Sequence, residues 1–252
     1  MPTKQTAKII TIHSFRRGTG KTTLASGLAA LGAAKGLKVG VVELGAELSS
    51  LNYAFGLGNY QFKHTLQDYL HQKVPITQAT QEITPYLKAY VSGNIYLTLN
   101  RLVPASENSS DDDPIDRLGS GLFDLIDTYH LDWLILDTIA GFNDEALLAM
   151  NLSDSLCIML RPDQQDYQGT ATAVQLYGQF DKLKAFLVLN AVPALFDLDS
   201  MKQQLATSFQ TSVGAVLPYV TEPFGAEGIA VFVLNHPQHT YTQQLNQLIN
   251  QI

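Results

Sequence analysis

The stretch from Ile9 to Thr23 (IITIHSFRRGTGKTT) limits most narrowly what this chain can fold into. Its apolar first part predicts a buried β-strand, its glycines predict a tight loop, and the Ala/Leu-rich segment that follows predicts a helix. Such a junction points backbone N–H groups and a helix N-terminus at one place, which is the environment that a phosphate group prefers. We therefore expect a phosphate-binding loop made of Gly18, Thr19, Gly20, Lys21, Thr22 and Thr23.

The residue types in this loop suit a nucleoside triphosphate with a divalent metal. Small residues at Gly18 and Gly20 let the backbone close around an anion, and the Lys21 ammonium can reach the outer phosphate oxygens. The hydroxyl of Thr22 is a ligand of the kind that Mg²⁺ uses. A nucleoside triphosphate with Mg²⁺ is therefore the expected ligand. The alternative is a chance Gly-Lys-Thr sequence in an ordinary strand-to-helix turn.

The loop resembles the deviant Walker A box of the ParA/MinD family, whose pattern is x-K-G-G-x-G-K-[ST]. The pattern falls on Phe15 to Thr22, and Phe15 stands where the strict Walker A motif has its first glycine. This resemblance implies an α/β P-loop fold of three layers, with a mostly parallel sheet covered by helices on both faces. It also implies a sandwich homodimer that forms with ATP.

Two arginines depart from the family pattern inside the loop. Arg16 replaces the signature lysine, which in the family reaches the partner's nucleotide, and Arg17 replaces a glycine. Arg16 keeps the positive charge and is a candidate catalytic residue that contacts the partner's phosphates. Arg161, at the end of a later strand, is a second candidate for this contact. For each of these residues, the alternative is a solvated arginine on the surface.

Acidic residues follow two predicted strands. Asp137 ends the strand WLILD, resembles the Walker B acid of the family, and is expected in the metal shell. Glu43 ends the strand KVGVVE and is a candidate catalytic acid, the alternative being a strand-end acid that faces solvent. Gly45 stands where the family has the Asp that positions the attacking water, and Glu47 is a possible substitute. Loss of that carboxylate affects hydrolysis more than binding, so we expect slow ATP hydrolysis.

Two further positions are expected near the base. Asn190 follows the strand LVL and resembles the family's asparagine, whose amide can donate to and accept from an adenine edge. Pro218 lies in the segment Leu217-Pro218-Tyr219, which is similar to the second base-lining loop of the family. For Asn190 the alternative is a residue of an ordinary β-to-α turn.

The rest of the chain alternates predicted strands with predicted helices, which favours a parallel sheet in one domain spanning residues 1–252. Residues 64–73 and 76–82 carry short helical patterns, and residues 104–114 form a polar, acidic, exposed loop. The C-terminal segment 239–252 predicts a helix with one apolar side. That helix contains no Lys or Arg, so a core-packing role is expected rather than a membrane anchor.

Composition limits the compartment and the partners. The net charge of −7 argues against an obligate nucleic-acid binder, and nucleoid DNA is a weakly supported matrix. The one cysteine, Cys157, lies in an apolar run and cannot form an internal disulfide, which suits a reducing cytoplasm. No apolar run is long enough to span a membrane.

Three functions remain open. The first is a ParA/MinD-type switch that dimerises with ATP and, with a small adaptor or activator protein, positions or partitions a cargo. The second is a pseudo-ATPase, an interaction protein whose nucleotide is structural or slowly exchanged. The third is a metabolic enzyme of the same superfamily. An iron–sulfur reductase is disfavoured because it needs two cysteines per chain.

Overall fold

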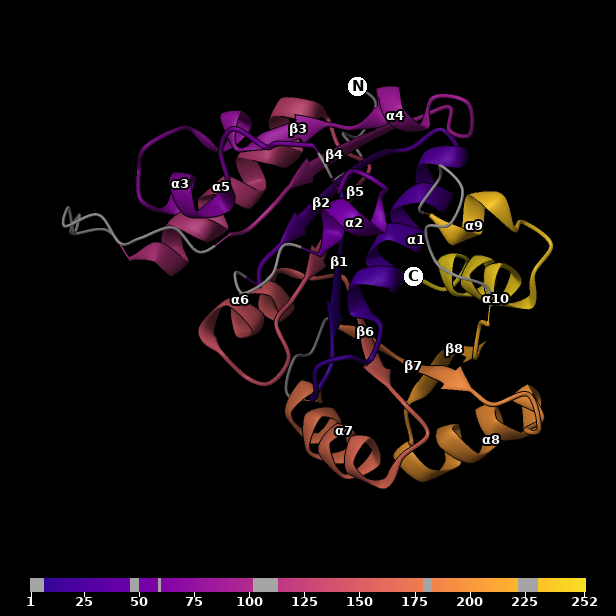
Figure 1. The fold of residues 1–252 in the computed structure, drawn as a ribbon. Helices are drawn as coiled ribbons and strands as arrows, with labels where there is room; N and C mark the ends of the chain where they lie inside the picture. Colours follow the sequence, from indigo (N-terminus) through magenta and orange to yellow (C-terminus); the bar gives the residue numbers. More distant parts are fainter. Residues whose placement is uncertain (1–6, 46–49, 59, 102–112, 179–182, 222–230) are drawn as a thin grey trace, which may run out of the picture.

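The computed structural model describes residues 7–45, 50–58, 60–101, 113–178, 183–221 and 231–252. The described strands form one eight-stranded sheet in the order β3-β4-β2-β5-β1-β6-β7-β8 (Figure 1). The strands are β1 Lys8–His13, β2 Lys38–Glu43, β3 Thr80–Glu82, β4 Asn94–Thr98, β5 Trp133–Asp137, β6 Ser155–Leu160, β7 Lys184–Val192 and β8 Ser212–Pro218. Strand β3 pairs antiparallel with β4, and the other pairings are parallel.

Helices cover both faces of this sheet. They are α1 Lys21–Ala34, α2 Leu51–Ala54, α3 Leu66–Leu70, α4 Thr84–Leu87, α5 Pro114–Tyr129, α6 Asp144–Leu152, α7 Gln164–Tyr177, α8 Leu198–Phe209, α9 Phe232–Asn235 and α10 Thr240–Ile249. Helices α1, α9 and α10 lie on one face, and α5, α6, α7 and α8 lie on the other (Figure 1). This arrangement confirms the predicted three-layer α/β fold with a mostly parallel sheet.

The core follows from the period-two alternation of side chains along buried strands. In β6, Cys157 and Met159 pack on the α1 face, whereas Leu156, Ile158 and Leu160 pack on the α7 face. Strands that are buried on both faces read as continuous apolar runs, as the sequence of β6 does. None of the helices in the described ranges is both long and apolar enough to cross a bilayer.

The predicted helix near the C-terminus forms as α10, and its apolar side is buried. Leu245 and Leu248 are fully buried against the cluster that contains α1 and β8 residues. This location confirms that the helix packs in the core. Its polar side carries glutamines and asparagines and faces outward.

Several local predictions were wrong. Residues 80–82 form strand β3 rather than helix, and only residues 76–78 of that segment are helical, as one 3₁₀ turn. Helix α6 was not predicted, although Asn143 caps it: the side-chain oxygen of Asn143 accepts a hydrogen bond from the backbone N–H of Ala146. The predicted acidic loop 104–114 lies almost entirely outside the described residues.

Candidate functional site

The loop between β1 and α1 has the backbone that an anion site requires. Gly18 and Gly20 have φ of 73° and 99°, a left-handed conformation that glycine adopts without steric cost. Among the described residues, no side chain caps α1 and no acid lies in its first turn, so its N–H groups remain available. Arg17 is absent from the described non-glycine residues with positive φ, so its Cβ introduces no strain of that kind.

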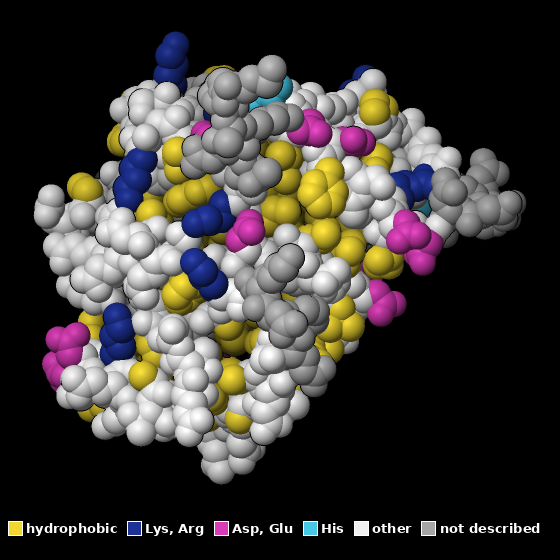
Figure 2. Space-filling model, turned by 180° about the vertical axis from the view of Figure 1, so that it is seen from behind, with side chains coloured by type: hydrophobic (Ala, Val, Ile, Leu, Met, Phe, Trp, Pro, Cys, Tyr) yellow, Lys and Arg dark blue, Asp and Glu magenta, His cyan; other side chains and the backbone are white. Residues whose placement is uncertain are grey.

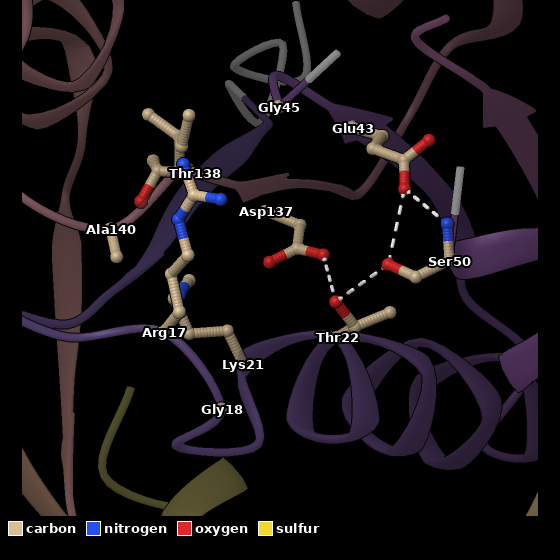
Figure 3. Close-up of a pocket in the computed structure, with 11 residues that line it drawn as sticks. Arg17, Gly18, Lys21, Thr22, Glu43, Gly45, Ser50, Asp137, Thr138 and Ala140 are labelled. Carbon is tan, nitrogen blue, oxygen red and sulfur yellow. Dashed lines mark hydrogen bonds between the residues drawn. The ribbon is translucent and has the colours of Figure 1, made fainter. Parts of the chain in front are cut away.

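A cavity of about 300 Å³ opens between this loop and the carboxyl ends of β2 and β5 (Figure 3). Its volume falls at the lower end of the range for small-molecule sites. The lining residues come from the loop, from the end of β2 and from the segment after β5. They are Arg17, Gly18, Lys21, Thr22, Glu43, Gly45, Ser50, Asp137, Thr138, Ile139 and Ala140.

Lys21 lies at the base of the loop, where its ammonium donates to Ser14 Oγ at 2.9 Å. The pKa of Lys21 lies below its usual value, chiefly because the ammonium is buried. The negative charge of Asp137 opposes this lowering of the pKa, and the positive charge of Arg17 adds to it. The Ser14 hydroxyl in turn donates to the carbonyl of Arg16, so hydrogen bonds connect the Lys21 ammonium to the backbone of the loop. A phosphate would give this cation a stronger partner than a neutral hydroxyl.

Thr22 and Asp137, the two predicted metal ligands, lie in direct contact. The Thr22 hydroxyl donates to Asp137 Oδ2 at 2.7 Å, while Asp137 Oδ1 is buried without a hydrogen-bond partner among the described residues. Burial raises the pKa of Asp137 to about 7, against the lowering effects of the Thr22 hydrogen bond and Lys21; Glu43 raises it further. An orphaned buried carboxylate oxygen beside a hydroxyl fits Mg²⁺, whose charge would hold the carboxylate ionised.

Glu43 lies on the other wall of the cavity and is only 3% exposed. Its Oε1 accepts from the backbone N–H and hydroxyl of Ser50 and from the N–H of Leu51, while Oε2 accepts from the N–H of Asn100. The carboxylate thus ties the end of β2 to the start of α2 and to the segment after β4. Its proposed catalytic role would have to act through this network.

Ser50 is a site residue that the sequence analysis missed. Its hydroxyl lies 3.2 Å from Thr22 Oγ1 and 3.3 Å from Glu43 Oε1. No spacing rule linked it to the loop because the two hydroxyls are brought together by the packing of α2 on α1. In the sequence, only the Ser-Ser pair at 49–50, shortly after the strand-end acid Glu43, could have indicated a hydroxyl near the site.

His13 is a second missed residue, at the end of β1. It is fully buried, and its Nδ1 lies 2.7 Å from Thr138 Oγ1. Because the Thr138 hydroxyl donates to the carbonyl of Ile12, Nδ1 carries the proton in this pair. The imidazole therefore ties the strand before the loop to the segment after Asp137.

Gly45, which the sequence resemblance aligns with the water-positioning Asp of the ParA/MinD family, lines the cavity. A Cβ at Gly45 would lie 3.7 Å from Ile139 Cβ, which is an ordinary contact. The position therefore has room for a side chain and lacks one. The suggested substitute, Glu47, lies outside the described residues.

The two predicted base-contacting residues lie at adjacent strand ends but outside this cavity. Asn190 belongs to β7, and its amide donates to the carbonyl of Thr19 at 2.8 Å. Pro218 ends β8 beside Val192. In this conformation Asn190 braces the loop, and a role for it at the adenine edge stays a prediction. Thr23 lines a separate cavity of about 60 Å³ beside α9.

The two candidate arginines share the same pair of carboxylates at the start of α7. Arg16 lies 3.0 Å from Asp163 and 3.4 Å from Asp166, and Arg161 lies 3.6 Å from Asp163 and 3.3 Å from Asp166. The structure thus brings Arg16 and Arg161 together, and each is paired within its own chain. Their contact with a partner's nucleotide stays a prediction.

Comparisons with known proteins show which chains this one is similar to. A family model described as AAA domain matches residues 7–190. The flagellum site-determining protein YlxH of Helicobacter pylori is 25% identical over 190 residues, which cover 75% of this chain and 60% of that protein. The chain spans only 53% and 60% of the lengths of the two curated relatives that head the comparison.

Solved structures match over nearly the whole chain. The MinC:MinD cell division complex of Aquifex aeolicus has a TM-score of 0.76 at 19% identity, covering 97% of this chain and 95% of that one. The septum site-determining protein MinD of Pyrococcus horikoshii, complexed with Mg-ADP, has a TM-score of 0.70 at 20% identity, with the same two coverages. The chain therefore belongs to the AAA domain family, and it has the P-loop fold of the ParA/MinD type.

Proposed function

We propose that this chain binds ATP with Mg²⁺ in the cavity beside Lys21 and acts as a ParA/MinD-type positioning or partition switch. The observation that carries the proposal is the convergence of an anion-ready loop, Lys21 and the Thr22–Asp137 pair on one cavity. Thr22 and Asp137 would hold the metal, which would neutralise phosphate charge when bound. Lys21 would leave Ser14 for the phosphate oxygens.

The switch would work through ATP-dependent pairing of two copies, with Arg16 reaching the nucleotide of the second copy. Similarity to YlxH and MinD supports a role in positioning, and a small adaptor or activator protein would couple the switch to its cargo. DNA as a matrix has little support. On the face shown in Figure 2, the Lys and Arg side chains are scattered, with Asp and Glu side chains among them, and the net charge is −7.

A pseudo-ATPase is the second candidate, and Gly45 favours it. Gly45 lines the cavity without a side chain, so it provides no carboxylate to position water, although a Cβ there would make only ordinary contacts. In that case the nucleotide would be structural or exchanged slowly, and the chain would act as an interaction protein. A metabolic enzyme of the same superfamily is the third candidate, to be tested by metabolite screening.

Molar mass measured by light scattering tests the proposal. We expect a monomer without nucleotide or with ADP, and a dimer with ATP or a non-hydrolysable analogue in the presence of Mg²⁺. The Lys21→Ala variant is the control and should stay monomeric throughout. A monomer under every condition, in protein that binds ATP, would refute the switch. Equal dimerisation with ADP and ATP, without turnover, would favour the pseudo-ATPase.

A further inference from the structure

Ser50 belongs to a chain of polar contacts that crosses the cavity. The chain runs from Asp137 Oδ2 to Thr22 Oγ1 at 2.7 Å, on to Ser50 Oγ at 3.2 Å, and from there to Glu43 Oε1 at 3.3 Å (Figure 3). It connects the ends of β5 and β2 with the starts of α1 and α2. The Ser50 backbone is fixed independently, because its N–H donates to Glu43 Oε1 at 2.8 Å.

The hydroxyl of Ser50 is held loosely by comparison. Thr22 gives its proton to Asp137, so Ser50 is the donor toward Thr22, and its single proton serves two acceptors. Both contacts exceed the usual O–H···O separation of about 2.7–2.8 Å. The Ser50 oxygen therefore keeps lone pairs for a third partner inside the cavity.

The spacing of these oxygens matches the shell of one small cation. Mg²⁺ binds oxygen ligands octahedrally at about 2.0–2.1 Å, which places neighbouring ligands about 2.9 Å apart. Thr22 Oγ1 lies 2.7 Å from Asp137 Oδ2 and 3.2 Å from Ser50 Oγ, so the Thr22 oxygen is close to that separation from each. Thr22 Oγ1 is thus spaced from both Asp137 Oδ2 and Ser50 Oγ as neighbouring ligands of one Mg²⁺ ion would be, and all three are oxygens of the type that Mg²⁺ prefers.

We propose that Ser50 Oγ is a direct ligand of the Mg²⁺ ion in this site, alongside Thr22. The inference rests on the proposed nucleotide function and extends it, because it adds a ligand from the residue just before α2 to those from the loop and from β5. Metal binding would fix the Ser50 hydroxyl and, through Glu43, the start of α2. The arrival of the metal would thereby be transmitted to an element outside the phosphate loop.

The affinity for Mn²⁺ in the presence of saturating ADP tests this role without turnover. Free Mn²⁺ is counted by EPR for the wild type, Ser50→Ala and Ser50→Thr. Loss of the hydroxyl should weaken Mn²⁺ binding by about 10-fold or more, the scale seen when metal-site partners are removed. Ser50→Thr keeps the hydroxyl and should stay within about 3-fold of the wild type. ADP affinity in EDTA should be the same in all three.

Ser26→Ala is the matched control. Ser26 lies one turn beyond Thr22 on α1, and its hydroxyl donates to the carbonyl of Thr23, so this variant loses a buried hydroxyl that does not line the cavity. Its Mn²⁺ affinity should equal that of the wild type. An unchanged affinity in Ser50→Ala, in protein that binds ADP, would overturn the ligand role and leave the proposed function standing. Failure of every protein to bind ADP would overturn both.

Replacing Ser50 with cysteine tests direct metal ligation independently, even if the alanine variant does not fold. A soft sulfur ligand favours Cd²⁺ over Mg²⁺, so Ser50→Cys should bind Mg²⁺ more weakly and Cd²⁺ more tightly than the wild type. Cys157 does not confuse the result, because it is fully buried and burial raises the pKa of its thiol to about 12. No change in the preference between the two metals would exclude direct ligation.

Discussion

At the scale of single residues, Gly45 is the position where adding one carboxylate group should change the rate of ATP hydrolysis most. Its Cα lies at the cavity, and a Cβ there would meet only ordinary contacts with Ile139. We predict that Gly45→Asp raises the rate of ATP hydrolysis at least about tenfold, because a carboxylate there can orient or deprotonate the attacking water. Steady-state phosphate release measures the rate.

Gly45→Asn serves as the control for that experiment. Its side chain has the size of aspartate without the charge, so it should leave hydrolysis near the wild-type rate. If Gly45→Asp folds and binds ATP yet hydrolyses it no faster, the absent carboxylate is not what limits turnover.

His13 links stability to pH. Burial, with a smaller contribution from Lys21, lowers the pKa of His13 from 6.5 to about 3. Between these values the unfolded chain takes up a proton that the folded chain does not, so stability is lost as pH falls below about 6.5. We expect this residue to account for about 2 kcal/mol of the lost free energy of unfolding at pH 5.

The comparison with His13→Asn isolates that effect. The asparagine amide can still donate to Thr138 but does not titrate, so urea unfolding of this variant should weaken less between pH 7 and pH 5. An identical loss of unfolding free energy in the two proteins would show that the imidazole is not buried in its neutral form.

At the scale of elements, the start of α7 decides where Arg16 lies. The Arg16 side chain is 33% accessible and Asp163 is 40% accessible; Asp166 is only 2% accessible but keeps Arg161 as a partner. Loss of the Arg16 ion pairs should therefore cost about 1 kcal/mol or less. We predict that Arg16→Ala folds but fails to dimerise with the ATP analogue, whereas Arg16→Lys dimerises. Light scattering separates these outcomes.

Arg161→Ala tests the competing assignment. It removes the other arginine from the same two aspartates and should leave ATP-dependent dimerisation intact. Loss of the dimer in Arg161→Ala and its retention in Arg16→Ala would assign the contact with the second copy to Arg161.

The individual strands and helices also show which parts of the fold could be predicted from the sequence. Strand β1, the glycine loop and α1 were predicted because apolar period, glycine and the Lys-Thr pair are all local signals. Strand β3 was not, since Thr80–Glu82 is stabilised by pairing with β4, a contact that is distant along the chain. Asn190 was expected just after its strand, with an ordinary turn as the alternative, but β7 continues through it to Val192 across an irregular register with β8.

The same division holds for the candidate site. Lys21, Thr22 and Asp137 were identified because each follows a recognisable strand or loop pattern. Ser50 and His13 were missed because their partners, Thr22 and Thr138, are brought near them only by the tertiary fold. Hydrogen bonds between residues far apart in sequence carry no local pattern.

At the scale of the whole molecule, α10 closes the core on the α1 face. Leu245 is fully buried there, and its side chain lies close to Gly27 of α1. We predict that Leu245→Ala lowers the free energy of unfolding by about 2–5 kcal/mol, as expected for a large-to-small change in a packed core. Urea unfolding measures the loss, and Gln247→Ala on the same helix is the control, with little expected change.

The pairing of Arg16 inside its own chain bears on how easily two copies would separate. An arginine that leaves two aspartates for a phosphate exchanges one set of charge contacts for another, so association gains only the difference between them. Dissociation returns the guanidinium to carboxylates that are already in position. A complex built on such an exchange is readily reversible, which is a useful property in a timer that must reset.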